Sequence, residues 1–316
     1  MKTFQKLRPA AAWLAIAGLA LGLAACGDEG GGGSPSGTAA STDASTGSST
    51  GSSTAGDGFQ APGDDETGGK NKPVKIGVVG ASGPQFEVLK TNAEAEGIYI
   101  EYVDFTDYTQ PNPATTTGEL DLNQFQHIIY LAAYNVEAEG GLVPIGSTAI
   151  YPLALYSKQY TDVASIPEGA EITIPNDVTN QARALNVLAS AGLLALKDGT
   201  ASLYATPDDI DQANSKVKVT PVAAEQTGRS LDDPNIAGAV INNDYVSDSG
   251  LDPRSAIAQD DPASDAALPF VNIWVTREAD QDNPVYAEIV RLAAQDDFGQ
   301  ALEDNSGGTG VVVNID

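Results

Sequence analysis

The chain has 316 residues and carries 43 acidic against 16 basic side chains, a formal net charge of −27 at neutral pH. This balance argues against nucleic-acid binding, which requires basic patches, and against electrostatic attachment to anionic lipid. The sequence contains one cysteine and one histidine, so no internal disulfide can form. A zinc site or a histidine-dependent triad would have to use His127.

Residues 1–25 have the layout of a secretory signal peptide. Lys2, Lys6 and Arg8 give a positive start, and the apolar run AAAWLAIAGLALGLAA follows, too short and too rich in small residues for a membrane span. Cys26 comes directly after it and resembles the lipobox cysteine of bacterial lipoproteins, which is lipidated and becomes the mature N-terminus. We expect a lipid anchor, such as palmitate, on the extracytoplasmic face of the cell membrane. The alternative is a cleaved signal with an incidental cysteine.

Residues 26–70 differ in composition, since glycine, serine and threonine dominate and apolar residues are almost absent. Such a segment cannot offset the entropy lost on ordering, so we expect a flexible tether with a root-mean-square reach of roughly 35–40 Å. Stable anchoring at Cys26 would need more than one acyl chain. The folded part begins at about residue 71 and is long enough for one large domain or two lobes.

The folded part opens with a strand–helix–strand pattern. The run KPVKIGVVG, ending at Gly80, is typical of a buried strand, residues 84–97 have helical spacing with a glycine stop, and residues 98–105 form a second strand. This order predicts parallel pairing with a right-handed crossover. The turn from Gly80 to Gly83 lacks the lysine of a phosphate loop and the full dinucleotide spacing, so it is a weak candidate for a nucleotide site.

Strands and helices continue to alternate, which indicates an α/β fold class. We expect a crossing along residues 144–158 and a return near 245–268, which would give two lobes with a ligand cleft between them. Lobe 1 would comprise residues 71–150 and 246–316, and lobe 2 residues 151–245. A single continuous α/β domain is the alternative. The further elements that we expect are strands at 170–177, 216–222, 237–246 and 269–278 and helices at 178–196 and 283–302.

The stretch TIPNDVTNQARAL places an arginine where the helix dipole disfavours a cation. Asp177 or Asn176 can cap a helix that begins near Val178, and Arg183 then falls in its first or second turn. That placement is explained if the arginine and the free N–H groups both face an anion such as a small carboxylate. Asn180 lies three residues earlier on the same helix face. A surface salt bridge between Arg183 and a nearby acid is the alternative.

Three polar side chains fall near the expected ends of strands. Asn242 ends the apolar run AGAVIN, and open α/β sheets bind ligands in the crevice outside the carboxyl ends of their strands. Asn272 interrupts the apolar run PFVNIWV, where its amide must find partners that a ligand could supply. Tyr108 lies in the loop DFTDYTQPNPA after the second strand. Each asparagine could instead be a satisfied structural residue.

The stretch LDLNQFQHIIYLAAYN holds the only histidine. Phe125 and His127 would share one face of an extended segment, and Tyr130 and Tyr134 would share one face of a helix that begins near Ile128. Such an aromatic stripe alone is typical of a core. The sequence contains no nucleophile elbow, and no nucleophile lies beside the histidine, so we expect neither an enzyme nor a metal site.

Six segments, in this order, resemble the NlpA-type lipoproteins, which are methionine-binding proteins of ABC importers: DFTDYTQPNPA, GELDLNQFQHIIYLAAYN, YPLALYSK, IPNDVTNQARAL, EQTGRSLDDPNIAGAVINNDYV and FVNIWVTRE. They cover most of residues 73–295. The resemblance implies a two-lobed, type II periplasmic-binding-protein-like fold that encloses methionine between the lobes. Arg183 and the asparagines would bind the amino-acid head group, while the aromatics and His127 would line the side-chain pocket. The ligand-binding positions of the family match Tyr108, Phe125, His127, Tyr130, Asn180, Arg183, Asn242 and Asn272.

On this resemblance we expect a monomeric, membrane-anchored solute-binding lipoprotein without a cofactor. It would capture methionine and deliver it to the permease of an ABC transporter, whose separate ATPase subunit drives transport. The lobes would close about a hinge near residues 147–156 and the return segment. The alternatives are a binding protein for another amino acid or for a methionine-containing peptide, and a surface lipoprotein that serves adhesion. A tethered hydrolase is disfavoured because no nucleophile–base pair is evident.

Overall fold

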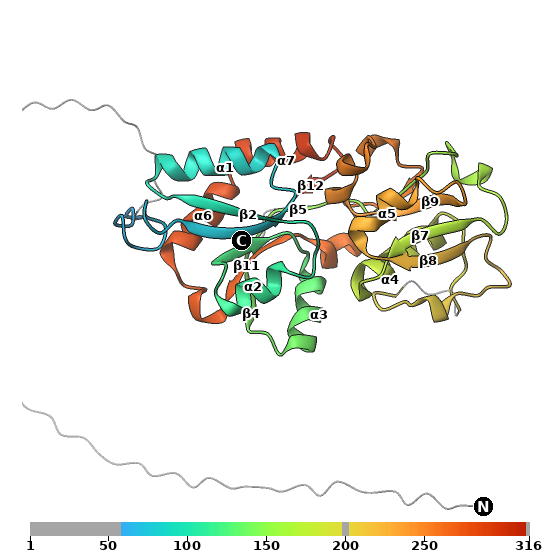
Figure 1. Ribbon diagram of the computed structural model, residues 1–316, viewed down its shortest axis with the longest axis horizontal. Helices are drawn as coiled ribbons and strands as arrows, with labels where there is room; N and C mark the ends of the chain where they lie inside the picture. Colours follow the sequence, from blue (N-terminus) through green and yellow to red (C-terminus); the bar gives the residue numbers. More distant parts are fainter. Residues whose placement is uncertain (1–57, 198–201, 314–316) are drawn as a thin grey trace, which may run out of the picture. The chain divides into compact units, whose positions relative to one another are not determined.

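The computed structural model describes residues 58–197 and 202–313 (Figure 1). The predicted signal peptide, the lipidation site Cys26 and the predicted tether up to residue 57 lie outside the described residues. All described residues belong to one compact unit, Ser52–Asp316. Within the described ranges, no helix has both the length and the apolar character needed to cross a membrane.

Lobe 1 is built on a five-stranded sheet in the order β2–β1–β3–β11–β4. β1 pairs in parallel with β2 and β3, as the strand–helix–strand pattern predicts, and β11 pairs antiparallel with β3 and β4. The helices α1, α6 and α7 pack against one another (Figure 1). The elements of this lobe are β1 (Val74–Val79), α1 (Pro84–Ala95), β2 (Ile100–Phe105), α2 (Pro111–Thr117), β3 (Leu122–Gln124), α3 (Ile128–Ala138), β4 (Leu142–Ser147), β11 (Ile273–Arg277), α6 (Pro284–Ala293) and α7 (Asp296–Asn305).

Helix α1 begins and ends where the sequence predicts. Pro84 occupies its first turn, and the chain leaves the helix through Gly97, whose φ of 77° is costly for a residue with a side chain. The last helical stretch differs from the prediction. It was expected as one helix over 283–302, but it divides into α6 and α7 because the chain leaves helical geometry at Gln295, whose ψ is 155°.

The predicted tether ends earlier than expected. Residues 58–70 form turns that are hydrogen-bonded to one another and to lobe 1: Tyr99 N donates to Gly68 O at 2.8 Å, and Gly68 N donates to Lys72 O at 2.8 Å. The ring of Phe59 packs against the core of the same lobe. The expected tether boundary is therefore too far along the chain, because this ring and these backbone bonds dock the segment that precedes the first strand.

Lobe 2 is built on a second five-stranded sheet in the order β10–β6–β9–β7–β8. β7 pairs in parallel with both β8 and β9, and β6 pairs antiparallel with β9 and β10. Helix α4 covers this sheet with an apolar face and ends before Gly192, whose φ is 72°, so it is shorter than the predicted helix over 178–196. The elements are β6 (Ala154–Tyr156), β7 (Glu171–Pro175), α4 (Val178–Ser190), β8 (Lys218–Val222), α5 (Ala224–Ser230), β9 (Ile236–Ile241) and β10 (Ala258–Gln259).

Each lobe has its own apolar core. Lobe 1 buries Trp274 and Phe298 almost completely, and lobe 2 does the same with Ile172 and Leu188. A third cluster joins side chains of both lobes, among them Tyr108 of lobe 1 and residues of β9. The expected two-lobed α/β architecture is confirmed, and the lobes meet through aromatic and apolar contacts around the ends of their strands.

Two connections link the lobes. The chain passes from β5 (Ala149–Ile150) to β6 at the predicted crossing, and it returns between β10 and β11. The predicted return at residue 246 is too early, because β10 still pairs with β6 of lobe 2. Near the end of the chain β12 (Val311–Val312) pairs antiparallel with β5, so this segment is hydrogen-bonded to the start of the crossing between the lobes.

Candidate ligand site

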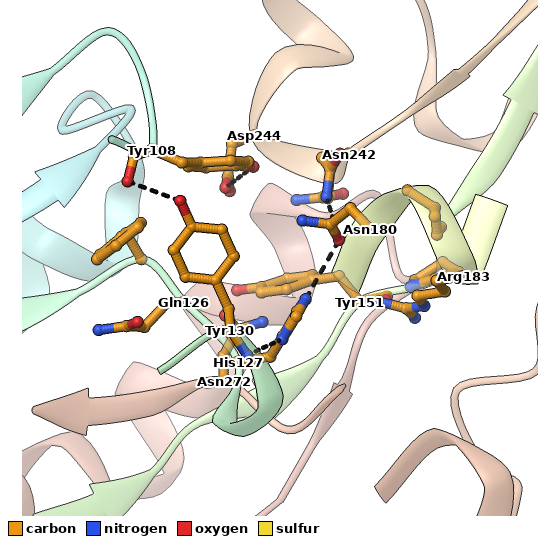
Figure 2. A pocket seen from close by; sticks show the side chains of 14 residues that line it. Tyr108, Gln126, His127, Tyr130, Tyr151, Asn180, Arg183, Asn242, Asp244 and Asn272 are labelled. Atoms are coloured by element: carbon orange, nitrogen blue, oxygen red, sulfur yellow. Dashed lines mark hydrogen bonds between the residues drawn. The ribbon is translucent and has the colours of Figure 1, made fainter. Parts of the chain in front are cut away.

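A cavity lies between the lobes (Figure 2). Its walls come from the loops after β2 and β3, the first turns of α3 and α4, the loop after β9 and the two connections between the lobes. The carboxyl ends of the parallel strands β2, β7 and β9 therefore open onto it. The structure brings together all eight residues predicted from the sequence: Tyr108, Phe125, His127, Tyr130, Asn180, Arg183, Asn242 and Asn272.

Asp177 is the N-cap of α4, one of the two candidates that the sequence left open. Its carboxylate accepts from the backbone N–H of Asn180 at 2.9 Å and from the Asn180 side-chain Nδ2 at 3.1 and 3.2 Å. Since Nδ2 is held by the cap, Oδ1 of Asn180 points the other way. It accepts from Asn242 Nδ2 at 3.0 Å and lies 3.2 Å from His127 Nε2 (Figure 2). The cap thus orients a polar chain across the cavity wall.

His127 is a neutral hydrogen-bonding residue. The backbone N–H of Tyr130 donates to its Nδ1 at 3.2 Å, so the ring proton sits on Nε2 and is donated to Asn180 Oδ1. Burial lowers the pKa of His127 to about 3, and the positive charge of Arg183 acts in the same direction. The imidazole therefore stays uncharged near neutral pH, and its accepting nitrogen is already used by α3.

Arg183 is buried and fixed by an acid of the return segment. Its Nε donates to Asp260 Oδ2 at 2.6 Å, and its Nη2 donates to Asp260 Oδ1 at 3.2 Å and to the carbonyl oxygen of Tyr151 at 2.8 Å. The guanidinium carbon lies 4.1 Å from the centroid of the Phe270 ring. The salt bridge considered as an alternative exists, but the arginine is only 5% exposed and also lines the cavity. The hydrogen bonds within the described part of the chain leave Nη1 unused.

Asn242 carries a buried acceptor that lacks a donor. Its Nδ2 binds Asn180, whereas its Oδ1 is inaccessible and has no partner among the described residues. Such an acceptor costs about 1–3 kcal/mol unless another molecule supplies a donor.

Asn272 lies directly before β11 rather than inside the strand. Its backbone N–H donates to the carbonyl oxygen of Ala149 at 2.8 Å, and its carbonyl oxygen accepts from the backbone N–H of Thr148 at 2.9 Å. Its side chain is thereby directed into the cavity wall.

Three aromatic rings form one side of the cavity. The ring centroids of Tyr108, Phe125 and Tyr130 are separated by 5.8 to 6.2 Å, within the range of favourable aromatic pairs. Tyr130 Oη donates to the carbonyl oxygen of Tyr108 at 3.0 Å, which fixes the two rings across the loop after β2. Tyr134 does not line the cavity. It packs against a separate apolar cluster of lobe 1, with its hydroxyl 2.9 Å from Thr116 Oγ1.

The cavity wall also contains six residues that were not predicted from the sequence: Gln126, Tyr151, Pro152, Leu153, Asn243 and Asp244. Tyr151 lies in the crossing segment, where no local pattern distinguishes it. Gln126 belongs to a buried amide network with Asn112 and lies directly before His127 in the sequence. Asp244 accepts from Tyr108 Oη at 2.7 Å. Its position two residues after Asn242, in the same loop, was a usable signal.

The comparisons with known proteins agree with this architecture. The model of the family described as NlpA lipoprotein matches residues 74–314. The chain belongs to the NlpA lipoprotein family. Its relatives include the D-methionine-binding lipoprotein MetQ of Salmonella typhi, which is 39% identical over 231 residues, covering 72% of this chain and 83% of the relative.

Solved structures of this family superpose on the same region. A crystal structure of the methionine-binding protein MetQ is 35% identical, with a TM-score of 0.71, and covers 77% of this chain and 98% of its own. A nutrient-binding protein from Burkholderia cenocepacia, solved with methionine bound, is 32% identical, with a TM-score of 0.69, and covers 76% of this chain and 99% of its own. The family and the two-lobed fold expected from the sequence are thereby confirmed.

Proposed function

We propose that this protein is a solute-binding lipoprotein that captures methionine between its lobes and delivers it to an ABC transporter. The observation that carries the proposal is the pairing, in one cavity, of a buried and immobilised Arg183 with the orphaned acceptor of Asn242. A free amino acid supplies a carboxylate for the first and an ammonium donor for the second. The names of its NlpA relatives agree with this ligand.

The rest of the ligand would lie against the aromatic wall. A thioether is polarizable and packs well against aromatic rings, and Tyr108, Phe125 and Tyr130 line the cavity. His127, neutral and bonded on both nitrogens, would contribute packing rather than charge. The side chain of methionine thus fits the apolar side of the cavity, and its head group fits the polar side.

The protein would act by binding and without covalent chemistry. Lipidation of Cys26 would anchor it to the extracytoplasmic face of the cell membrane as a monomer. Its partners there would be the permease and the ATPase subunit of a methionine importer. Ligand would close the lobes about the two connections, near Ala149–Ala154 and between Gln259 and Ile273. Closure would present both lobes to the permease in one fixed arrangement.

Thermal unfolding of the mature chain without lipid, starting at residue 27, tests the proposal. Co-purified ligand is first removed by unfolding and refolding, and the protein is then heated with each member of a panel of amino acids and methionine-containing dipeptides. A ligand present at 100 times its dissociation constant should stabilise the fold by about 2.7 kcal/mol. We expect the largest stabilisation with methionine. The absence of a shift with every compound would overturn the proposal and favour an adhesive role.

A further inference from the structure

Asp244 is a carboxylate inside the ligand cavity. It lies in the short turn Asn243–Tyr245 that follows β9, two residues after Asn242, and its Oδ2 accepts a hydrogen bond from Tyr108 Oη at 2.7 Å. Among the described residues that line the cavity, Asp244 is the only carboxylate and Arg183 the only positively charged side chain. Figure 2 shows the carboxylate on the same side of the cavity as the Asn242 side chain.

No cation of the described residues neutralises Asp244. None of their ion pairs includes it, and Arg183, the cavity's base, is already bonded to Asp260. Asp248, in the turn that follows, carries the same charge. Burial raises the pKa of Asp244 to about 6, and Asp248 adds to the rise although the Tyr108 hydrogen bond opposes it. The side chain of Asp244 is half-buried, and a carboxylate that is partly shielded from water without a positive partner is destabilised, so a bound cation would stabilise it.

We propose that Asp244 and Asn242 together bind the α-ammonium group of the ligand and make that group a requirement for binding. The inference rests on the proposed function, because it assigns the head group of the same amino acid. Both acceptors come from one loop and line one cavity, and Asn242 Oδ1 has no other donor within the described part of the chain. With the unused Nη1 of Arg183 on the ligand carboxylate, the cavity offers a hydrogen-bond donor to one end of a zwitterion and a carboxylate to the other.

The assignment has a consequence for pH. An ammonium group binds the ionised form of Asp244, so affinity is at its maximum above the pKa of about 6 and falls below it, by up to tenfold per pH unit, as a proton must first be displaced. The His127 ring, with its pKa lowered to about 3, does not titrate in this interval. The titratable and charged groups around Asp244 are Tyr108 and Tyr130 from lobe 1, Tyr151 of the crossing segment, Tyr245 and Asp248 from lobe 2, and Arg183 and His127 of the cavity wall.

Calorimetric titration of the mature chain without lipid tests the inference. The two probes are methionine and its des-amino analogue 4-(methylthio)butanoic acid, and the proteins are the wild type and Asp244→Asn. This substitution keeps the shape of the side chain and an acceptor for Tyr108 but removes the charge. We expect Asp244→Asn to weaken methionine binding by about 10- to 100-fold and to leave the weak binding of the analogue unchanged or improved.

Asp248→Asn is the matched control, since Asp248 is exposed and lines only the neighbouring polar pockets. It should change methionine binding by no more than about twofold. The inference is overturned if Asp244→Asn binds methionine as the wild type does, or if the wild type binds the des-amino analogue as tightly as methionine. A wild-type affinity that is constant from pH 5 to pH 7 overturns it as well. Failure of the wild type to bind methionine at all would instead refute the proposed function.

Discussion

Replacing Asp260 with alanine removes the partner of a buried arginine. Asp260 accepts from Nε and Nη2 of Arg183 at 2.6 and 3.2 Å and from the backbone N–H of Leu153 at 2.9 Å. The substitution therefore leaves three donors without their acceptor at the crossing between the lobes. Because the side chain of Arg183 is only 6% exposed, its charge would remain in a poorly solvated position.

Breaking a buried pair by removing one partner costs about 3–5 kcal/mol. The side chain of Asp260 is 25% exposed, so water can partly replace it, and we expect a loss of about 3 kcal/mol in the free energy of unfolding. For a folded part of this size that loss corresponds to a fall of about 6–12 °C in the melting temperature. Urea unfolding at neutral pH, followed by tryptophan fluorescence, measures the change directly.

Asp252→Ala provides the control for this prediction. Asp252 accepts from the Nε, Nη2 and backbone N–H of Arg254 at 3.0, 2.9 and 2.9 Å. Both side chains are exposed, so its removal should cost no more than about 1 kcal/mol, the usual loss for an N-cap. Equal effects of Asp260→Ala and Asp252→Ala would refute the reasoning. They would mean that Asp260 does not hold Arg183 in the folded protein.

Two further predictions concern His127 and Gly97. The pKa of His127 is lowered to about 3 in the folded state, so as the pH falls below about 6.5 the unfolded chain takes up a proton on this residue before the folded chain does. Relative to His127→Gln, the wild type should therefore lose about 2 kcal/mol of unfolding free energy between pH 7 and pH 5, as measured by urea titrations. Parallel pH profiles of the two proteins would contradict a buried neutral ring. Gly97→Ala should destabilise the folded protein by about 1–2 kcal/mol, because φ is 77° and the new Cβ would lie 2.9 Å from the Cβ of Ala61. The control Gly141→Ala places its Cβ in open space and should be neutral. An unchanged melting temperature for Gly97→Ala would disprove the strained turn.

Local patterns predicted the parts of the fold that depend on neighbouring residues. The parallel pairing of β1 and β2 follows from the helix between them, and the cap at Asp177 follows from the side-chain chemistry of one turn. The convergence of Tyr108 and Asn242 on one cavity follows from the rule that ligands lie outside the carboxyl ends of parallel strands. The identity of the ligand came only from the family resemblance.

The features that escaped prediction depend on residues far apart in the chain. Asp260, the partner of Arg183, lies 77 residues from it and is one of 43 acidic residues, so no spacing rule selects it. The pairing of β10 with β6 involves two residues of each strand, which is too short a run for a periodic signal. Because β10 belongs to lobe 2, the chain returns to lobe 1 later than the predicted residue 246. Phe59 packs against lobe 1 as an isolated aromatic residue in a segment whose composition indicates disorder, so no local pattern predicts its docking.

A crystal structure of the mature chain with bound selenomethionine tests the central claim most directly. The only methionine of the sequence is Met1, so a chain starting at residue 27 contains none and any anomalous selenium peak comes from ligand. We predict one peak in the cavity, against the rings of Tyr108, Phe125 and Tyr130, with the ligand carboxylate on Arg183. A cavity without a selenium peak at saturating ligand, or a peak elsewhere on the protein, would contradict the proposed site.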